Sequence, residues 1–233
     1  MHLKINHLEY QYSNNQNFKL EIEKADVFLD ESLGIYGLSG SGKTTLGKIM
    51  GGLLKTTAID FFGAEVLYLP QVAENLLLGT SVRQTLKIIS EWKSRTFEEN
   101  FAMHLQKFGL QLSNIENKHG FELSAGELRI ISLSLAFSYE TDILVLDEPS
   151  IGLDWSARIE LIRQLQNFKK PLVLISHDYE MLRKLCARVW IMDRGKLVFQ
   201  GDFYQLEKND KLCSETGINF YKNLVKKRKL LLS

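Results

Sequence analysis

The chain has 233 residues, 45% of them hydrophobic and 24% charged, which is typical of a globular protein with a sizeable core. Its formal net charge of +1 speaks against binding nucleic acid through a large basic surface. The two cysteines, Cys186 and Cys213, have no metal-ligand spacing and fit a reducing compartment. No signal peptide opens the chain and no apolar run approaches the ~18 residues of a membrane span. We therefore expect other subunits to supply any membrane-spanning parts.

The first segments predict two half-buried strands. Residues 3–10 and 18–22 alternate apolar and polar side chains, and the polar stretch 13–17 between them predicts a turn. Tyr12 closes the first strand. Its ring is suited to stacking on a purine base, although an aromatic residue at a strand end more often only packs against its neighbours.

A glycine-rich sequence follows the buried-strand pattern of residues 33–36. Residues 37–44 match G-x-x-x-x-G-K-[ST], the phosphate-binding loop, and residues 45–50 predict the helix that leaves it. The glycines permit a tight turn whose amides face phosphate, and the helix N-terminus adds partial positive charge. We expect Lys43 to reach the β- and γ-phosphates and the Thr44 hydroxyl to bind Mg²⁺. The alternative is a chance glycine-rich turn, which the flanking strand and helix disfavour.

A helical insert is predicted in the middle of the chain. After the helix stop at Gly51-Gly52, residues 65–69 predict a strand that ends at Pro70-Gln71. From Thr80 to Leu112, apolar residues recur at helical spacing. The pentapeptide 123–127 then precedes an apolar helix over 130–137. Its Ser and Glu also match a capping box, which is a purely structural explanation of the pentapeptide.

Two further buried-strand patterns end in polar residues. Residues 142–147 end in Asp147, which suits a parallel strand that delivers a carboxylate to Mg²⁺, and Glu148 is placed to take a proton from the attacking water. Residues 172–175 end near His177, which can sense or polarise a γ-phosphate, although a lone histidine is more often packed or exposed. An amphipathic helix over 156–168 and a closing hairpin over 189–199 complete the pattern.

With these pieces in order, the chain resembles the ATP-binding subunit of ABC transporters over nearly its whole length. Residues 37–44 look like Walker A, 143–147 like Walker B, and 123–127 like the LSGGQ signature, which is the specific element. The roles that this resemblance implies are as follows: ATP contacts from Tyr12, Gly37, Ser39, Gly40, Ser41, Gly42, Lys43, Thr44 and Thr45; catalysis by Glu148, His177 and Gln71; Mg²⁺ binding by Thr44, Gln71 and Asp147; signature contacts to the ATP of a partner chain from Leu123, Ser124, Ala125, Gly126 and Glu127; and a D-loop at Asp154.

The resemblance implies an α/β fold in one ABC ATPase domain over residues 1–233. A P-loop NTPase core with a mixed, largely parallel central sheet and an N-terminal antiparallel β subdomain is expected in 1–72 and 121–210. A helical signature-motif subdomain is expected at about 73–120, and a C-terminal tail over 211–233. That tail carries a basic run at 226–229, which could contact anionic lipid. We favour the alternative, a solvated end without affinity for lipid.

A finer resemblance links residues 71–82 and Gly217-Ile218 to the energy-coupling-factor ATPases, which drive cobalt, nickel and vitamin uptake. The family's proline after the glutamine is Ala73 here. The signature also departs from the family, with Ala125 for its first glycine and Glu127 for its glutamine. Alanine suits that position only if φ stays negative. The segment between Lys43 and Gln71 is short, so one hairpin of the β subdomain should be reduced.

The resemblance implies two chains packed head to tail around two ATP molecules, with Mg²⁺, as a homo- or heterodimer. Membrane-spanning transporter subunits would be the partners, no nucleic acid is expected, and the location would be cytoplasmic, on the inner face of the cell membrane. Two alternatives stay open. One is a soluble ABC ATPase, for example of iron–sulfur assembly, and the other is a partner subunit that binds ATP without hydrolysing it.

Overall fold

The computed structural model describes residues 2–13, 15–28, 31–60, 63–72, 77–91 and 96–218. Ala73 and the basic run at 226–229 lie outside these ranges. The strands are β1 (His2–Tyr12), β2 (Asn15–Phe28), β3 (Leu33–Tyr36), β4 (Ile59–Asp60), β5 (Val66–Leu69), β6 (Ile143–Asp147), β7 (Leu172–Ile175), β8 (Arg188–Asp193) and β9 (Lys196–Asp202). The helices are α1 (Lys43–Met50), α2 (Val82–Ser90), α3 (Thr96–Lys107), α4 (Leu112–Ile115), η2 (Gly120–Glu122, a 3₁₀ turn), α5 (Ala125–Ser138), α6 (Trp155–Asn167), α7 (Tyr179–Leu185), α8 (Phe203–Lys208) and α9 (Asp210–Glu215).

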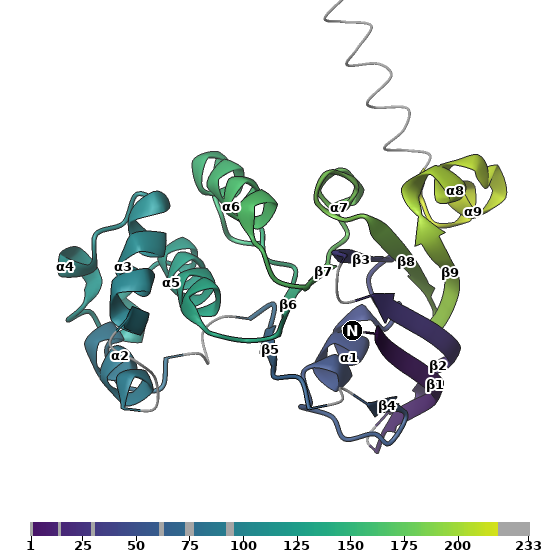
Figure 1. The fold of residues 1–233 in the computed structure, drawn as a ribbon, viewed down its shortest axis with the longest axis horizontal. Helices are drawn as coiled ribbons and strands as arrows, with labels where there is room; N and C mark the ends of the chain where they lie inside the picture. Colours follow the sequence, from purple (N-terminus) through teal and green to yellow (C-terminus); the bar gives the residue numbers. More distant parts are fainter. Residues whose placement is uncertain are drawn as a thin grey trace, which may run out of the picture.

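All of the described strands form one mixed sheet in the order β4-β1-β2-β9-β8-β3-β7-β6-β5 (Figure 1). Strands β8, β3, β7, β6 and β5 run parallel, whereas β1 pairs antiparallel with β2 and β4, and β8 with β9. The predicted fold class is confirmed, namely a largely parallel core with an N-terminal antiparallel part and a helical lobe. The carboxyl ends of β3, β6 and β7 meet at one edge, which is where parallel sheets usually bind ligands.

The short apolar strands end where the sequence predicts. Every residue of β3 and of β7 is buried, so their continuous apolar runs define both ends of each strand. The first two strands are longer than predicted. The turn predicted over 13–17 is shorter than expected, because Tyr12 pairs with Asn15 and β2 already begins there.

Apolar side chains pack against both faces of the sheet. On one face, helix α1 packs in one cluster with the parallel strands and with β1 and β2 of the same sheet, through residues such as Leu46, Leu8 and Leu20. Helices α6 to α9 cover the other face, where Cys213 and Ile218 are fully buried. The start of the predicted tail therefore packs on the core. The reduced hairpin is seen as β4, two residues that pair with β1.

The helical lobe has its own apolar cluster, formed by residues of α2, α3 and α5 such as Val82, Phe101 and Ile131. The helical insert predicted from Thr80 to Leu112 is seen as the separate helices α2 and α3, and Gly109 follows α3 with φ +84°. Helix α5 contributes to this cluster and also to the core of the sheet. It therefore connects the lobe to the sheet (Figure 1). In the described part of the chain, no helix combines the length and apolar character that a membrane crossing requires.

Candidate active site

A cavity of about 700 Å³ opens at the carboxyl edge of the parallel strands. Its wall is made by the first strands, the glycine-rich loop, and the loops that follow β5, β6 and β7. The predicted site residues that line it are Tyr12, Ser39, Gly40, Gly42, Lys43, Thr44, Thr45, Gln71, Glu148 and His177. Segments from five parts of the sequence thus converge on one space.

The glycine-rich loop depends on close backbone approach. Gly42 has φ +102°, and a Cβ there would lie 3.0 Å from the Phe18 ring. A Cβ on Gly37 would lie 2.3 Å from the Met192 carbonyl oxygen. Gly42 also stands at the N-terminus of α1 without a side-chain cap. The first backbone N–H groups of α1 are therefore suited to donate hydrogen bonds to an anion such as a phosphate.

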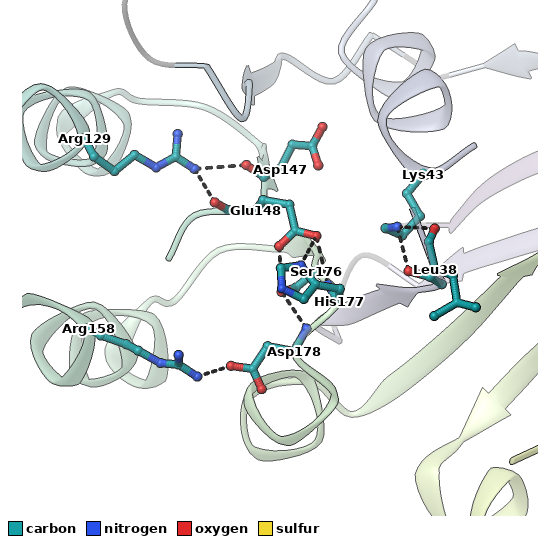
Figure 2. A network of polar contacts seen from close by, with 10 residues as sticks. Leu38, Lys43, Arg129, Asp147, Glu148, Arg158, Ser176, His177 and Asp178 are labelled. Carbon is teal, nitrogen blue, oxygen red and sulfur yellow. Dashed lines mark hydrogen bonds and ion pairs between the residues drawn. The ribbon is translucent and has the colours of Figure 1, made fainter. Parts of the chain in front are cut away.

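Lys43 is buried beside this loop. Its Nζ donates to the Gly37 carbonyl at 2.7 Å and to the Leu38 carbonyl at 3.0 Å (Figure 2). Burial lowers the pKa of Lys43, while the nearby carboxylates of Glu148 and Asp147 oppose that shift. A bound phosphate would give this ammonium group the charged partner that the two carbonyls do not supply.

Asp147 ends β6 next to Glu148, does not itself line the cavity, and is fully buried. Its Oδ2 accepts a 2.9 Å hydrogen bond from the Tyr68 hydroxyl, and its Oδ1 has no hydrogen-bond partner among the described residues. Burial raises the pKa of Asp147, and the hydroxyls of Thr44 and Tyr68 oppose the rise. A carboxylate oxygen without a partner beside a threonine hydroxyl fits Mg²⁺, a cation that prefers oxygen ligands.

We expect Tyr68→Phe to move the acid limb of the pH–activity profile to higher pH. The tyrosine hydroxyl favours the charged form of Asp147, so its loss raises the pKa of that carboxyl further. The direction is fixed because the lost hydrogen bond stabilised the charged form. The profile should be measured at subsaturating Mg²⁺. The matched control is Tyr179→Phe, which removes a hydroxyl bonded to Glu207 away from the cavity. An unchanged acid limb in Tyr68→Phe would contradict this role.

Glu148 reaches the cavity from the end of β6. One of its carboxylate oxygens accepts from the Ser176 hydroxyl at 3.1 Å and the other from the His177 backbone N–H at 2.9 Å. The ring Nδ1 of His177 lies 2.8 Å from the same carboxylate (Figure 2). The carboxylate is thus oriented by three contacts while it still lines the cavity, which is the geometry of a general base.

The D-loop and the segment after β7 are connected through α6. Asp154 caps α6, with its side chain accepting from the Ala157 N–H at 2.8 Å. Arg158, one turn further, forms an ion pair with Asp178, the residue after His177 (Figure 2). Asp154 does not line the cavity of its own chain, so its predicted role remains a prediction.

The signature residues also lie outside this cavity. Ser124 caps α5 and forms the expected capping box with Glu127. Ala125 begins the helix and is not among the residues with positive φ, so alanine is compatible with the backbone there. The backbone N–H of Ser124 and the ammonium group of Lys118 lower the pKa of Glu127. Lys118 therefore balances the charge that replaces the family's glutamine.

Tyr12 lines the cavity. Its hydroxyl lies 3.2 Å from the Thr45 Oγ1, and its ring meets Tyr10 edge-on at 5.1 Å. Phe18, for which the sequence suggests no role, lines the same cavity. Two aromatic rings therefore border the region beyond the phosphate loop, where a base would stack.

Tyr12→Ala is expected to weaken ATP binding by about 1–3 kcal/mol, the scale of one stacking contact. Tyr12→Phe should change little, because the ring remains. Isothermal calorimetry of the three chains measures the difference. Equal ATP affinity of the wild-type and Tyr12→Ala chains would refute the assignment and favour Tyr10 or another residue.

The fold and this cavity define a P-loop nucleotide-binding protein. Residues 20–151 match the ABC_tran family, described as ABC transporter, and the chain belongs to that family. It is accordingly an ATP-binding protein and an ATP hydrolase of the ABC type.

Relatives and solved structures agree with this assignment. A putative ABC transporter ATP-binding protein of Archaeoglobus fulgidus is 25% identical, with 91% of this chain and 94% of the relative covered. The energy-coupling factor transporter ATP-binding protein EcfA2 of Thermotoga maritima is 30% identical over 84% of this chain and 78% of the relative. A solved ATP-binding subunit of an ABC transporter superposes with TM-score 0.77 at 19% identity, covering 97% and 100% of the two chains. That last likeness concerns the fold alone.

Proposed function

We propose that this chain is the ATP-hydrolysing subunit of an ABC transporter, acting as a dimer around two ATP molecules. The observation that carries the proposal is the convergence of Lys43, Glu148 and His177 on one cavity beside a helix N-terminus. In this proposal one chain is a single ATPase domain, and its helical lobe presents the signature residues to the nucleotide of the partner chain.

Hydrolysis follows from the positions of the side chains. The backbone amides of the loop and the Lys43 ammonium group would hold the phosphates, which would place the γ-phosphate near the carboxyl ends of β6 and β7. Glu148 accepts the proton of the attacking water, and the Ser176 and His177 N–H contacts keep its carboxylate in place. His177 and Gln71 line the same space. Mg²⁺, held by Thr44 and Asp147 with Gln71, would neutralise charge on the phosphates.

The second nucleotide contact comes from the partner chain in this proposal. The Ser124 hydroxyl oxygen accepts from the Glu127 N–H, and a hydroxyl group can also donate its proton, here to a γ-phosphate of the partner's nucleotide. The first backbone N–H groups of α5 lie at a helix N-terminus, where such groups can donate hydrogen bonds to a phosphate. ATP then joins two chains, and loss of the γ-phosphate lets them separate.

An apolar cavity of about 230 Å³ between β5, α2 and α5 supports a membrane partner. Leu78 lines it and is exposed. The full lining comprises Leu67, Tyr68, Leu69, Leu78, Ile88, Ile89, Ser132, Leu135, Ala136 and Tyr139. We propose that a membrane-spanning subunit inserts an apolar segment there, which attaches this chain to the inner face of the membrane. Gln71 would then link the docked subunit to the ATP site.

The transported substrate is proposed to be a metal ion or a vitamin. This rests on the EcfA2 relative of Thermotoga maritima and on the resemblance of residues 71–82 to energy-coupling-factor ATPases. The direction would be import.

Co-expression with the membrane proteins encoded beside this chain tests the proposal. A stable detergent-solubilised complex whose ATPase activity requires those proteins is the expected result. Leu78→Asp and Ile89→Asp should release the chain from the complex, whereas Ile159→Asp, on an exposed part of α6, should not. ATPase activity of the chain alone without any membrane association would favour a soluble ABC ATPase. ATP binding without turnover in every assembly would favour a non-hydrolysing partner subunit.

A further inference from the structure

Arg129 is an arginine buried inside the protein, on the helix that begins at the signature residues. Only 2% of its surface is exposed. Burial lowers its pKa to about 10, so the side chain is still charged at neutral pH. No side-chain carboxylate forms a hydrogen bond with it among those described. The charge is instead satisfied by backbone carbonyls, which is unusual for a buried cation and suggests a specific role.

All five N–H groups of the guanidinium have a carbonyl acceptor. The acceptors come from the two segments that frame the cavity. Nε donates to Pro149 at 3.1 Å, and Nη1 donates to Pro70 at 2.8 Å and to Gln71 at 3.4 Å. Nη2 donates to Asp147 at 2.9 Å and to Glu148 at 2.8 Å (Figure 2). A planar fork of five donors can bridge these carbonyls, whereas a lysine ammonium group with three donors cannot.

The two carbonyls on Nη2 belong to the peptide planes on either side of the Glu148 Cα. Glu148 has φ +46°, in the left-handed region that residues with a side chain rarely adopt. Such a conformation persists only where the surroundings hold it. Because Nη2 binds both planes at once, it fixes the backbone rotation that determines where the Glu148 carboxylate points.

We infer that Arg129 is a positioning residue that holds Glu148 in its left-handed conformation and joins it to the backbone of Gln71. The inference rests on the proposed role of Glu148 as the base. With this clamp in place, the carboxylate meets Ser176 and His177 and faces the nucleotide cavity. Without it, the Glu148 backbone is free to relax and the carboxylate turns away from the water.

Arg129→Lys in the full chain and its partner assembly tests this inference. Misplacement of a catalytic group commonly costs one to two orders of magnitude, so turnover should fall about 10- to 100-fold. ATP affinity should stay within about threefold of wild type, because the phosphate loop is untouched. Arg163→Lys, an exposed arginine on α6, is the matched control and should keep full turnover. Near-normal turnover in Arg129→Lys would overturn the inference; a wild-type assembly without ATPase activity would instead overturn the proposed function.

A stability cycle distinguishes positioning from general support of the fold. Glycine adopts a positive φ without help, so Arg129→Lys should lower the urea midpoint less in a Glu148→Gly background than in the wild-type chain. A crystal structure of Arg129→Lys should show Glu148 with negative φ and its carboxylate away from His177. Equal midpoint shifts in the two backgrounds, or failure to fold in both, would show that Arg129 only supports the fold and would overturn the inference.

Discussion

Glu148→Gln is expected to lower ATP turnover by a factor on the order of 10²–10⁴, the usual size of general-base catalysis. The substitution keeps the size and hydrogen bonding of the side chain but removes the group that accepts the water's proton. ATP and Mg²⁺ should still bind, because Lys43, Thr44 and Asp147 are unchanged. With ATP the variant should shift toward an associated dimer, and that dimer should be lost when ADP replaces ATP.

The control for this variant is Glu160→Gln, which makes the same change on α6, where Glu160 pairs with Arg163 outside the cavity. If the chain pairs with a different ATPase subunit, the associated species requires that partner, so the assay uses co-expressed neighbours. Near-normal ATPase activity of Glu148→Gln in the competent assembly would rule out Glu148 as the base.

Lys43→Ala should weaken ATP binding by more than about tenfold, because a charge-assisted hydrogen bond to phosphate is lost. This variant should never show ATP-dependent association, which separates it from Glu148→Gln. Lys48→Ala on the same helix is the matched control, since Lys48 does not line the cavity. Calorimetry with ATP and Mg²⁺ measures the affinities. Wild-type affinity in Lys43→Ala would mean that the nucleotide phosphates bind elsewhere.

The sequence predicts the parts of this fold that local chemistry controls. Strands β3 and β7 end as predicted because continuous apolar runs are buried on both faces. The capping box of Ser124 and Glu127 is confirmed because both partners lie within one turn. The convergence of Lys43, Glu148 and His177 also follows from sequence, since each stands at the carboxyl end of a parallel strand pattern.

The sequence does not predict contacts that depend on distant segments. Tyr68 meets Asp147 across neighbouring strands, and Arg129 meets carbonyls from two separate loops. The sequence does carry one indication that Arg129 has a specific role: it is a lone charged residue within the apolar run 128–137. The positive φ of Glu148 gave no signal at all, because glutamate has no preference for that conformation. Strands β1 and β2 are longer than the side-chain pattern predicts, because backbone pairing between them determines where they end.

The identity of the nucleotide in the trapped complex tests the central claim most directly. Wild-type and Glu148→Gln assemblies are mixed with labelled ATP and Mg²⁺ and separated from free nucleotide, and the bound nucleotide is then analysed. The account predicts ADP and phosphate from the wild type and intact ATP in a dimeric Glu148→Gln complex. Intact ATP in both assemblies, or ADP formed equally fast in both, would contradict it.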